Sequence, residues 1–213
     1  MNEKTRVLLA DAADEFRHMA AEMIQQEADM EVVGQTGDGE ELLRMVRSLR
    51  PQVLVMDLVL SGLDGLGALA QLGQERPRVL VLDEATSGLD PAARSEILDI
   101  LLDFIQDERH SVLLSSHITT DLEQIADTIA YLHHGQLLFA KNKDDLMEEY
   151  GILRCSQQDL DRLPPEWIAA TCRTAAGCES LVHPRVSVLR ALPGVVCDAA
   201  SIDDIMRLTS KEG

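Results

Sequence analysis

The stretch VLVLDEATSGLD, residues 79–90, decides how this chain folds, because it joins an apolar run to a group of acidic and turn-forming residues. Four apolar residues, 79–82, come directly before Asp83 and Glu84. A short Val- and Leu-rich run of this kind is typical of a strand buried on both faces in a parallel sheet. We therefore expect two carboxylates at the end of a strand that needs a neighbour on each side.

Similar apolar runs lie before and after this strand and alternate with amphipathic helical patterns. Such alternation implies a parallel sheet with helices on both faces, so the expected fold class is α/β in three layers. A hairpin is expected over residues 128–140, and a small α+β appendage over residues 151–213. The expected strands of the sheet are residues 5–11, 30–34, 52–57, 78–83 and 111–116.

Composition limits the possible functions of the chain. Its 213 residues are 46% hydrophobic, enough for a sizeable core, and they carry a formal net charge of −18. Nucleic-acid binding rests on neutralising phosphates with Lys and Arg, so no nucleic-acid partner is expected. No signal peptide and no membrane-spanning run is recognisable. The four cysteines form no C-x-x-C pair, and a cytoplasmic protein with reduced thiols is expected.

From residue 76 to residue 213 the chain resembles the C-terminal half of a bacterial ABC transporter ATP-binding protein. The apolar strand ending in Asp83-Glu84 resembles the magnesium-carboxylate strand of that family, and Ser-Gly-Leu-Asp resembles its D-loop. Ser-Ser-His, ending at His117, resembles the H-loop. The resemblance implies that Glu84 polarises the attacking water, that His117 contacts the γ-phosphate, and that the partner is a membrane permease subunit.

The other half of such an ATPase is missing from the sequence. The chain has no Gly-Lys dipeptide, and lysine is absent from residues 5–140. A P-loop needs both its backbone amides and its lysine to hold the β- and γ-phosphates. We therefore expect no ATP to be bound and no turnover, although the ATPase-like residues leave the question of enzymatic activity open.

Residues 1–75 resemble a different family, the response-regulator receiver of the sporulation type. RVLLAD, residues 6–11, is similar to a first strand ending in a carboxylate, and PQVLVMD, residues 51–57, to a third strand ending in the phosphoacceptor. LVLSGLDGLG, residues 58–67, is similar to the loop and helix start that follow. The resemblance implies that Asp57 accepts a phosphoryl group in a phosphorelay and that a histidine kinase is the partner.

Three departures weaken the receiver resemblance. The family usually has two adjacent acids after the first strand, whereas Asp11 is followed by Ala12. The loop after the phosphoacceptor usually carries Pro where Ser61 stands. The switch Ser/Thr and the lysine of the last two receiver strands are not recognisable.

Three candidate metal ligands, Asp11, Asp57 and Asp83, each end an expected strand. Ligands of open α/β sheets bind outside the carboxyl ends of the strands, so these acids are expected at one edge. Like charges so close together cannot all stay ionised without a counter-ion, and Mg²⁺ suits oxygen ligands. The alternative is that the acids are solvated or protonated strand ends.

The two resemblances predict a chimera: a receiver-like half over 1–75, an ATPase-like half over 76–150 that completes the same flavodoxin-like or P-loop-ATPase-like domain, and a transporter-type appendage over 151–213. By extent, an ABC-transporter-derived protein is the first hypothesis. A receiver with Asp57 as phosphoacceptor is the second. A non-enzymatic engineered or recombinant hybrid is the third. ATP binding would favour the first and phosphate incorporation the second.

Overall fold

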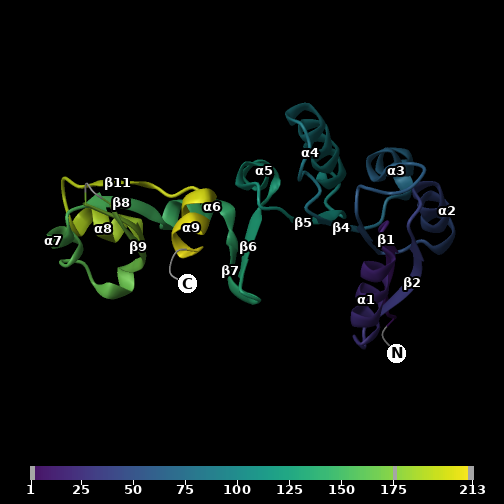
Figure 1. Ribbon diagram of the computed structural model, residues 1–213, viewed down its shortest axis with the longest axis horizontal. Coiled ribbons are helices and arrows are strands. Elements are labelled where there is room, and N and C mark those ends of the chain that lie inside the picture. The colour runs from purple at the N-terminus through teal and green to yellow at the C-terminus, as the bar shows by residue number, and fades with distance from the viewer. Residues whose placement is uncertain (1–2, 175–176, 211–213) are drawn as a thin grey trace. The chain divides into compact units, whose positions relative to one another are not determined.

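The computed structural model describes residues 3–174 and 177–210 (Figure 1). The chain divides into two compact units, Met1–Asp121 and Leu122–Gly213, which are described separately. The division falls inside one helix, α5 (Thr119–Ile125). Residues 128–149 therefore lie in the second unit, although the sequence placed them with the parallel sheet, because Ile129 and Leu146 pack in a core that lies wholly in that unit.

The first unit alternates strands and helices as the sequence predicts. Its elements are β1 (Thr5–Ala10), α1 (Asp14–Gln25), β2 (Met30–Thr36), α2 (Gly39–Leu49), β3 (Val53–Met56), α3 (Gly65–Leu72), the 3-10 turn η1 (Gly73–Glu75), β4 (Val79–Asp83), α4 (Pro91–Ile105) and β5 (Ser111–Ser115).

The five strands form one parallel sheet in the order β2-β1-β3-β4-β5. The expected continuous sheet is confirmed, because β3 pairs with β4 across the point where the two resemblances meet. This order is that of flavodoxin-like folds. The P-loop-ATPase-like alternative for the fold finds no support here.

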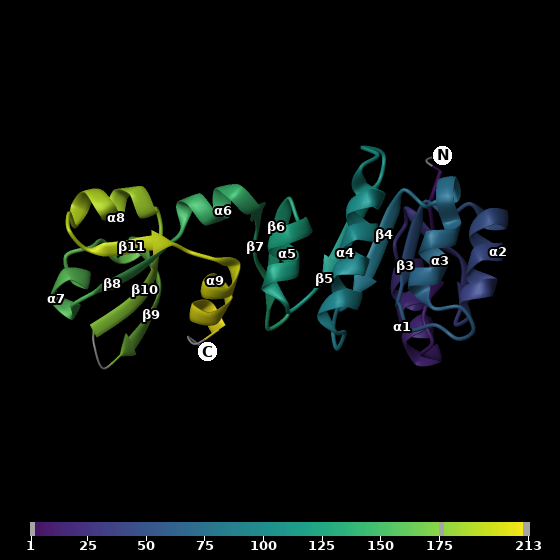
Figure 2. The ribbon, with the colours of Figure 1, turned by 90° about the horizontal axis from the view of Figure 1, so that it is seen from above.

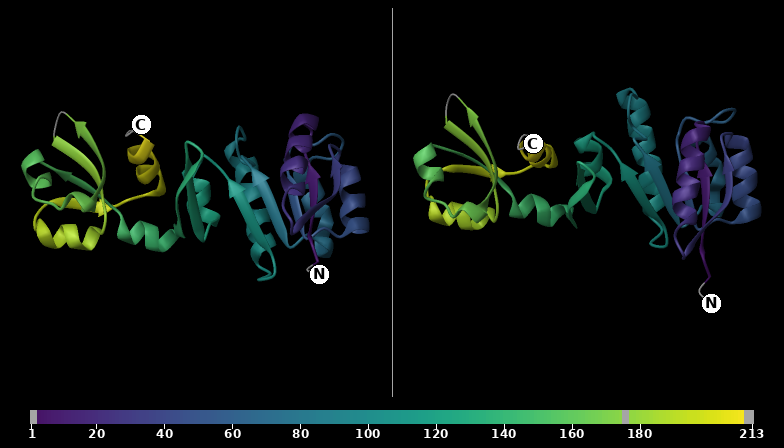
Figure 3. Two further views of the ribbon diagram at one scale, coloured as in Figure 1. Left: turned by 90° about the horizontal axis from the view of Figure 1, so that it is seen from below. Right: turned by 60° about the horizontal axis from the view of Figure 1, so that its bottom comes forward.

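Strand register assigns alternate residues to the two faces of the sheet. One face is buried over the three central strands, where it carries Leu8, Ala10, Leu54, Met56, Leu80 and Leu82. Its cover comes from α2, α3 and α4, whose buried side chains include Leu42, Leu69 and Leu101. Figure 2 looks onto α3 and α4, and the left panel of Figure 3, seen from the opposite side, looks onto α1.

The other face of the sheet is covered only in part. α1 packs there on Val7 and Leu9 through Ala21, with Val53 and Val55 at the border of this cluster. By register the same face continues over β4 and β5 through Val79, Val81 and Leu113. Leu113 is 63% exposed, so among the described residues of the first unit the β5 end of this face is less covered than the part under α1.

Helix starts in the first unit follow from capping residues. Asp38, Asp64 and Asp90 are the N-caps of α2, α3 and α4, and each accepts a hydrogen bond from the backbone of the first turn. Pro91 follows at the first helical position of α4, where its fixed φ and missing N–H are tolerated. These caps fix where each strand-to-helix loop ends.

The second unit contains a four-stranded antiparallel sheet in the order β11-β8-β10-β9 and a separate hairpin, β6–β7, which the sequence predicts. The bounds of these strands and of the helices between them, in chain order, are β6 (Thr128–His133), β7 (Gln136–Asn142), α6 (Lys143–Glu149), β8 (Gly151–Cys155), α7 (Gln157–Leu160), the 3-10 turn η2 (Pro165–Trp167), β9 (Ile168–Thr174), β10 (Gly177–Val182), α8 (Arg185–Ala191), β11 (Val196–Ala199) and α9 (Ile202–Thr209).

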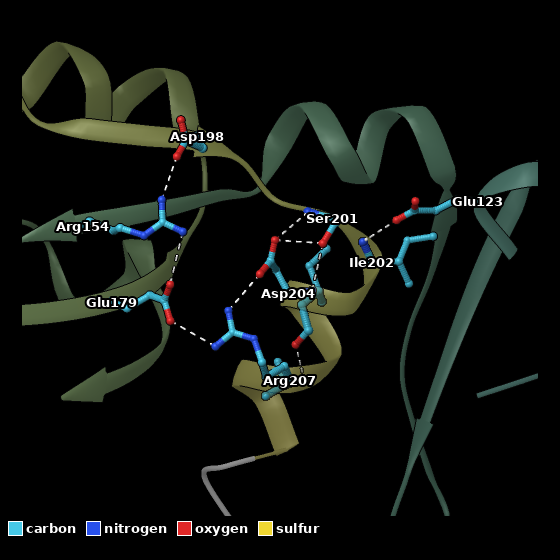
Figure 4. Close-up of polar contacts among 10 residues, drawn as sticks. Glu123, Arg154, Glu179, Asp198, Ser201, Ile202, Asp204 and Arg207 are labelled. Atoms are coloured by element: carbon cyan, nitrogen blue, oxygen red, sulfur yellow. Dashed lines mark hydrogen bonds and ion pairs between the residues drawn. The ribbon is translucent and has the colours of Figure 1, made fainter. Parts of the chain in front are cut away.

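A chain of ion pairs fastens α9 to the antiparallel sheet (Figure 4). Arg207 of α9 bonds to Glu179 of β10 at 3.0 Å and to Asp204 one turn earlier at 2.8 Å. Arg154 of β8 then lies between Glu179 and Asp198, at 3.4 and 2.8 Å. The apolar side of α9 is buried at the same place, through residues such as Ile205.

Asp204 also closes the capping box of α9 with Ser201. Burial raises the pKa of the Asp204 carboxyl, but hydrogen bonds from Arg207 and Ser201 and the charge of Arg207 outweigh it and hold the pKa below its usual value. A carboxyl whose pKa is lower in the folded state stabilises the fold at neutral pH. That contribution is lost as the pH falls through the folded pKa.

We predict that Asp204→Asn lowers the thermal midpoint of unfolding at pH 7 and that this deficit shrinks as the pH falls below about 4, near the pKa of an unfolded Asp. Calorimetry of parent and variant between neutral and acid pH measures it. Asp203→Asn is the matched control, because Asp203 is exposed on the same turn. A deficit that stays constant down to acid pH would contradict the proposed role of Asp204.

Candidate functional site

The carboxyl ends of the parallel strands form the candidate site in the first unit. Asp11 follows β1 and Asp57 follows β3, and both residues are half-buried. The Asp57 N–H donates to the Ala10 carbonyl at 2.9 Å, which ties the two strand ends together. The chain reverses its strand order between β1 and β3, and such switch points are where open α/β sheets bind ligands.

Each of these carboxylates uses one oxygen to hold its own loop. Asp11 Oδ1 accepts from the Ala13 N–H at 2.7 Å, and Asp57 Oδ1 accepts from the Val59 N–H at 3.1 Å. Within residues 3–174 and 177–210, neither Oδ2 atom accepts a hydrogen bond. The two carboxylates are therefore oriented by the backbone and keep an oxygen that can meet a ligand.

The loop after Asp57 is fixed to the loop after β2. Ser61 donates to the Gly37 carbonyl through its N–H at 2.9 Å and through Oγ at 2.7 Å. The Gly39 N–H donates back to the Ser61 carbonyl at 3.0 Å. A proline at position 61 would lack the N–H that makes the first bond. This explains how the chain can depart from the family pattern at this position and still order the loop.

Arg17 is a residue of this site that the sequence analysis missed. Its guanidinium donates to the Asp11 carbonyl and to the Asp14 carboxylate, and its side chain is only 13% exposed. It brings a positive charge to the strand ends in a segment without lysine. The spacing of Asp14 and Arg17, three residues apart at the start of an amphipathic helix, was the signal that could have revealed this pair.

The ends of β4 and β5 form a second group of polar side chains. Ser115 Oγ donates to Asp83 Oδ1, and the Glu84 N–H donates to the Ser115 carbonyl at 3.1 Å. His117 Nδ1 lies 2.5 Å from Glu84 Oε2. The structure thus brings together Glu84 and His117, the two ATPase-like candidates, but their side chains are 41% and 65% exposed, so water screens the pair.

The three-carboxylate metal site has no geometric support. Asp83 is exposed and engaged by Ser115, while Asp11 and Asp57 lie at the neighbouring strand ends. No group of three or more His, Cys, Asp or Glu side chains among the described residues is arranged to hold a metal ion. A site shared by Asp11, Asp57 and Asp83 therefore stays a prediction.

Comparisons with known proteins match the first unit. The family model of the response regulator receiver domain matches residues 7–100. A protein-glutamate methylesterase/protein-glutamine glutaminase of Myxococcus xanthus is 42% identical over 57 residues, which are 27% of this chain and 16% of that protein. The transcriptional regulatory protein LiaR of Bacillus subtilis is 40% identical over 57 residues, 27% of each chain.

Among solved structures, the response regulator domain of Thermotoga maritima CheB matches with a TM-score of 0.42 and 22% identity, over 55% of this chain and 80% of that one. The chain spans less than a third of the methylesterase and of LiaR, so each of these matches concerns only a part of the relative. The N-terminal part of the chain is a response regulator receiver domain with a flavodoxin-like fold.

The receiver match runs through residues 76–100, where the transporter-ATPase resemblance is strongest, and these comparisons give that resemblance and the predicted chimera no support. The net negative charge of this chain is the sole ground for expecting no nucleic-acid partner. The comparisons do not support that expectation, because the relative LiaR is by name a transcriptional regulatory protein. No membrane partner is indicated. None of the helices in the described residues is long and apolar enough to cross a membrane.

Gly65 allows α3 to start directly against the loop that carries Asp57. A Cβ at this position would lie 2.9 Å from the Asp57 carbonyl oxygen and 2.8 Å from Leu58 Cα. Backbone atoms cannot yield as a flexible side chain can. We predict that Gly65→Ala lowers the free energy of unfolding by about 1–3 kcal/mol in urea denaturation.

Gly67→Ala is the matched control for this prediction. It lies on the same helix, and the nearest atom to its added Cβ is a Leu63 methyl group at 2.8 Å, which can rotate away. Alanine is also the better helix former, so this change should be close to neutral. Equal effects of the two substitutions would show that Gly65 has no special contact with the loop.

Proposed function

We propose that the first unit accepts a phosphoryl group on Asp57 from a histidine kinase or a small phosphodonor, so that the chain acts in two-component signalling. The observation that supports this is the position of Asp57 and Asp11 at the switch point of the sheet, half-buried and fixed by backbone hydrogen bonds. The match of residues 7–100 to the receiver family supports the same proposal.

In this reaction an oxygen of Asp57 attacks the phosphorus atom of the donor. A new P–O bond to Asp57 forms as the bond from phosphorus to the donor's leaving atom breaks, which leaves an acyl phosphate. Asp11 and Asp57 would hold Mg²⁺, which when bound neutralises charge on the transferring oxygens. The two carboxylates suit such a cation because the backbone orients each one through Oδ1, and among the described residues Oδ2 accepts no hydrogen bond and can meet a ligand.

The site offers less positive charge than phosphoryl transfer usually requires. Lysine is absent from residues 5–140, and the guanidinium of Arg17 is already engaged by the Asp11 carbonyl and by Asp14. Positive charge that meets the transferring oxygens stabilises the transition state. We therefore propose that phosphorylation of Asp57 is slow and depends strongly on the divalent cation.

We predict that the full chain incorporates phosphate from acetyl phosphate in the presence of Mg²⁺ and that Asp57→Asn abolishes this. Intact-mass spectrometry measures the added phosphoryl group, and hydroxylamine should remove it because an acyl phosphate is labile. Asp83→Asn is the matched control, since Asp83 ends a neighbouring strand but bonds to Ser115. It should keep most of the incorporation.

Two outcomes would contradict the proposal. One is an absence of phosphate on a folded parent protein at saturating donor and Mg²⁺. The other is incorporation that survives Asp57→Asn, which would place the phosphoryl group on another residue. The amide of asparagine has nearly the shape of the carboxylate, so the variant should fold like the parent.

We predict that Mg²⁺ raises the thermal midpoint of the first unit through Asp11 and Asp57. A ligand that binds only the folded state stabilises it by about 2.7 kcal/mol at a hundredfold excess over its dissociation constant. Asp11→Asn should remove the response to millimolar Mg²⁺, whereas Asp83→Asn should retain it. An unchanged midpoint of the parent would mean that no such site exists, and loss of the response in Asp83→Asn would restore the three-carboxylate site.

The second unit carries no assigned activity. Its proposed origin, an appendage of the transporter-ATPase type over residues 151–213, and the permease partner that goes with it rest on the sequence resemblance alone. The Glu84–His117 contact lies in the first unit and does not make a nucleotide site, because no Gly-Lys dipeptide is present to hold phosphates.

A further inference from the structure

We propose that Cys155 and Cys178 of the second unit form a site of reversible oxidation, at which a low-molecular-weight disulfide such as oxidised glutathione joins them by a disulfide bond. Both cysteines are free in this structure and belong to the four-stranded antiparallel sheet. All residues of the site lie within Leu122–Gly213. The proposal goes beyond the phosphoacceptor function and uses no residue of the first unit.

Strand register places the two cysteines directly opposite each other. Cys155 ends β8 and pairs with Cys178 of β10, and these strands are the two central ones of the sheet. Directly opposite residues of antiparallel strands have Cα atoms about 4.5–5.5 Å apart and side chains on the same face. A disulfide spans Cα separations of about 4.4–6.8 Å, so the backbone positions admit the bond.

The next pair along the same strands shows that opposite side chains reach each other here. Arg154 lies opposite Glu179, and Arg154 Nη2 is 3.4 Å from Glu179 Oε1 (Figure 4). Successive side chains of a strand alternate between faces, so the cysteine pair points to the other face of the sheet. There Cys178 is buried in an apolar cluster against which Cys155 packs.

The other two cysteines are not placed to compete for this bond. Cys197 of β11 pairs with the residue two positions before Cys155, which makes the two cysteines diagonal neighbours with Cα atoms about 7–8 Å apart. Cysteines more than about 7 Å apart cannot be bridged without backbone movement, and β8 separates Cys197 from Cys178. Cys172 of β9 pairs with Glu179 and so lies on the opposite face.

The two thiols differ in their access to solvent. Cys155 is half-buried, whereas Cys178 is 6% exposed and donates to Gln157 Oε1 at 3.4 Å. Cys155 is therefore the thiol that meets the oxidant first. Burial, and then the neighbouring Cys178, raise the pKa of the Cys155 thiol. A small thiolate fraction makes oxidation slow at neutral pH, although a thiolate of high pKa is a strong nucleophile.

The reaction consists of two thiol–disulfide exchange steps. The Cys155 thiolate attacks one sulfur of oxidised glutathione, so that a mixed disulfide forms and one glutathione thiolate leaves. The sulfur of Cys178 then attacks the Cys155 sulfur and displaces the second glutathione thiolate. The protons of the two protein thiols end on the two glutathione thiolates. Two protein thiols are thus oxidised as one glutathione disulfide is reduced, and dithiothreitol reverses the change.

Incubation of the reduced full chain with oxidised glutathione at about pH 8.5, near the usual pKa of a cysteine, tests the proposal. Rapid alkylation in denaturant and peptide mass spectrometry then identify the thiols that were consumed. The expected product has Cys155 joined to Cys178, with Cys172 and Cys197 alkylated. Cys172→Ser is the matched control, because it removes a thiol from the other face and should leave the product unchanged.

Two further variants separate this site from non-specific oxidation. Cys178→Ser should keep glutathione attached to Cys155, because no second thiol resolves the mixed disulfide. Cys155→Ser should leave Cys178 reduced, because a buried thiol does not meet the oxidant. In the parent, the bond should raise the thermal midpoint of the second unit, since it restricts the unfolded chain between the two cysteines. Dithiothreitol should reverse that rise.

Three results would overturn the proposal. The first is a parent in which all four thiols are still alkylated after prolonged oxidation. The second is a disulfide that includes Cys172 or Cys197 as often as it joins Cys155 to Cys178. The third is glutathione that persists on Cys155 in the parent as it does in Cys178→Ser, because Cys178 would then lie out of reach.

Discussion

The parallel pairing of β3 between β1 and β4 is the constraint on which the first unit depends. It aligns the strand ends, so that the Asp57 N–H reaches the Ala10 carbonyl and two carboxylates meet at the switch point. The same register decides which residues line each face of the sheet. Because the side-chain period of a strand is two, a slip by one residue would exchange the buried row that includes Leu54 and Leu80 for the half-covered row that includes Val81.

Sequence reasoning could predict the strands, the helices between them and the placement of Asp11 and Asp57, because each follows from local apolar patterns and from the geometry of parallel sheets. It could not predict where the first unit ends, since that depends on which core Ile129 and Leu146 join. It also missed Arg17, whose role depends on a backbone carbonyl, and the bond from Ser115 that occupies Asp83. The helical spacing of Asp14 and Arg17 predicts their ion pair, but neither the bond of Arg17 to the Asp11 carbonyl nor the bond of Ser115 to Asp83 leaves a periodic signal.

The conflict between the two sequence resemblances has a physical basis in β4. An apolar strand that ends in an acid satisfies the packing of any doubly covered parallel sheet, so the motif around Asp83 and Glu84 establishes a central parallel strand but not the order of the strands. The neighbours of that strand define it. With β3 on one side and β5 on the other, the sheet takes the flavodoxin-like order, and the Glu84–His117 pair is left as an exposed contact at its edge.

The half-covered face of the sheet has a consequence for the thermodynamics of the first unit. Phe16, Met19 and Met23 of α1 and Leu113 of β5 already contact water in the folded state, so unfolding newly hydrates less apolar surface than in a sheet with helices over both faces. The heat capacity of unfolding and the denaturant dependence of stability both scale with that surface. The stability curve of this unit should therefore be flatter with temperature than its length implies, and its unfolding in urea more gradual.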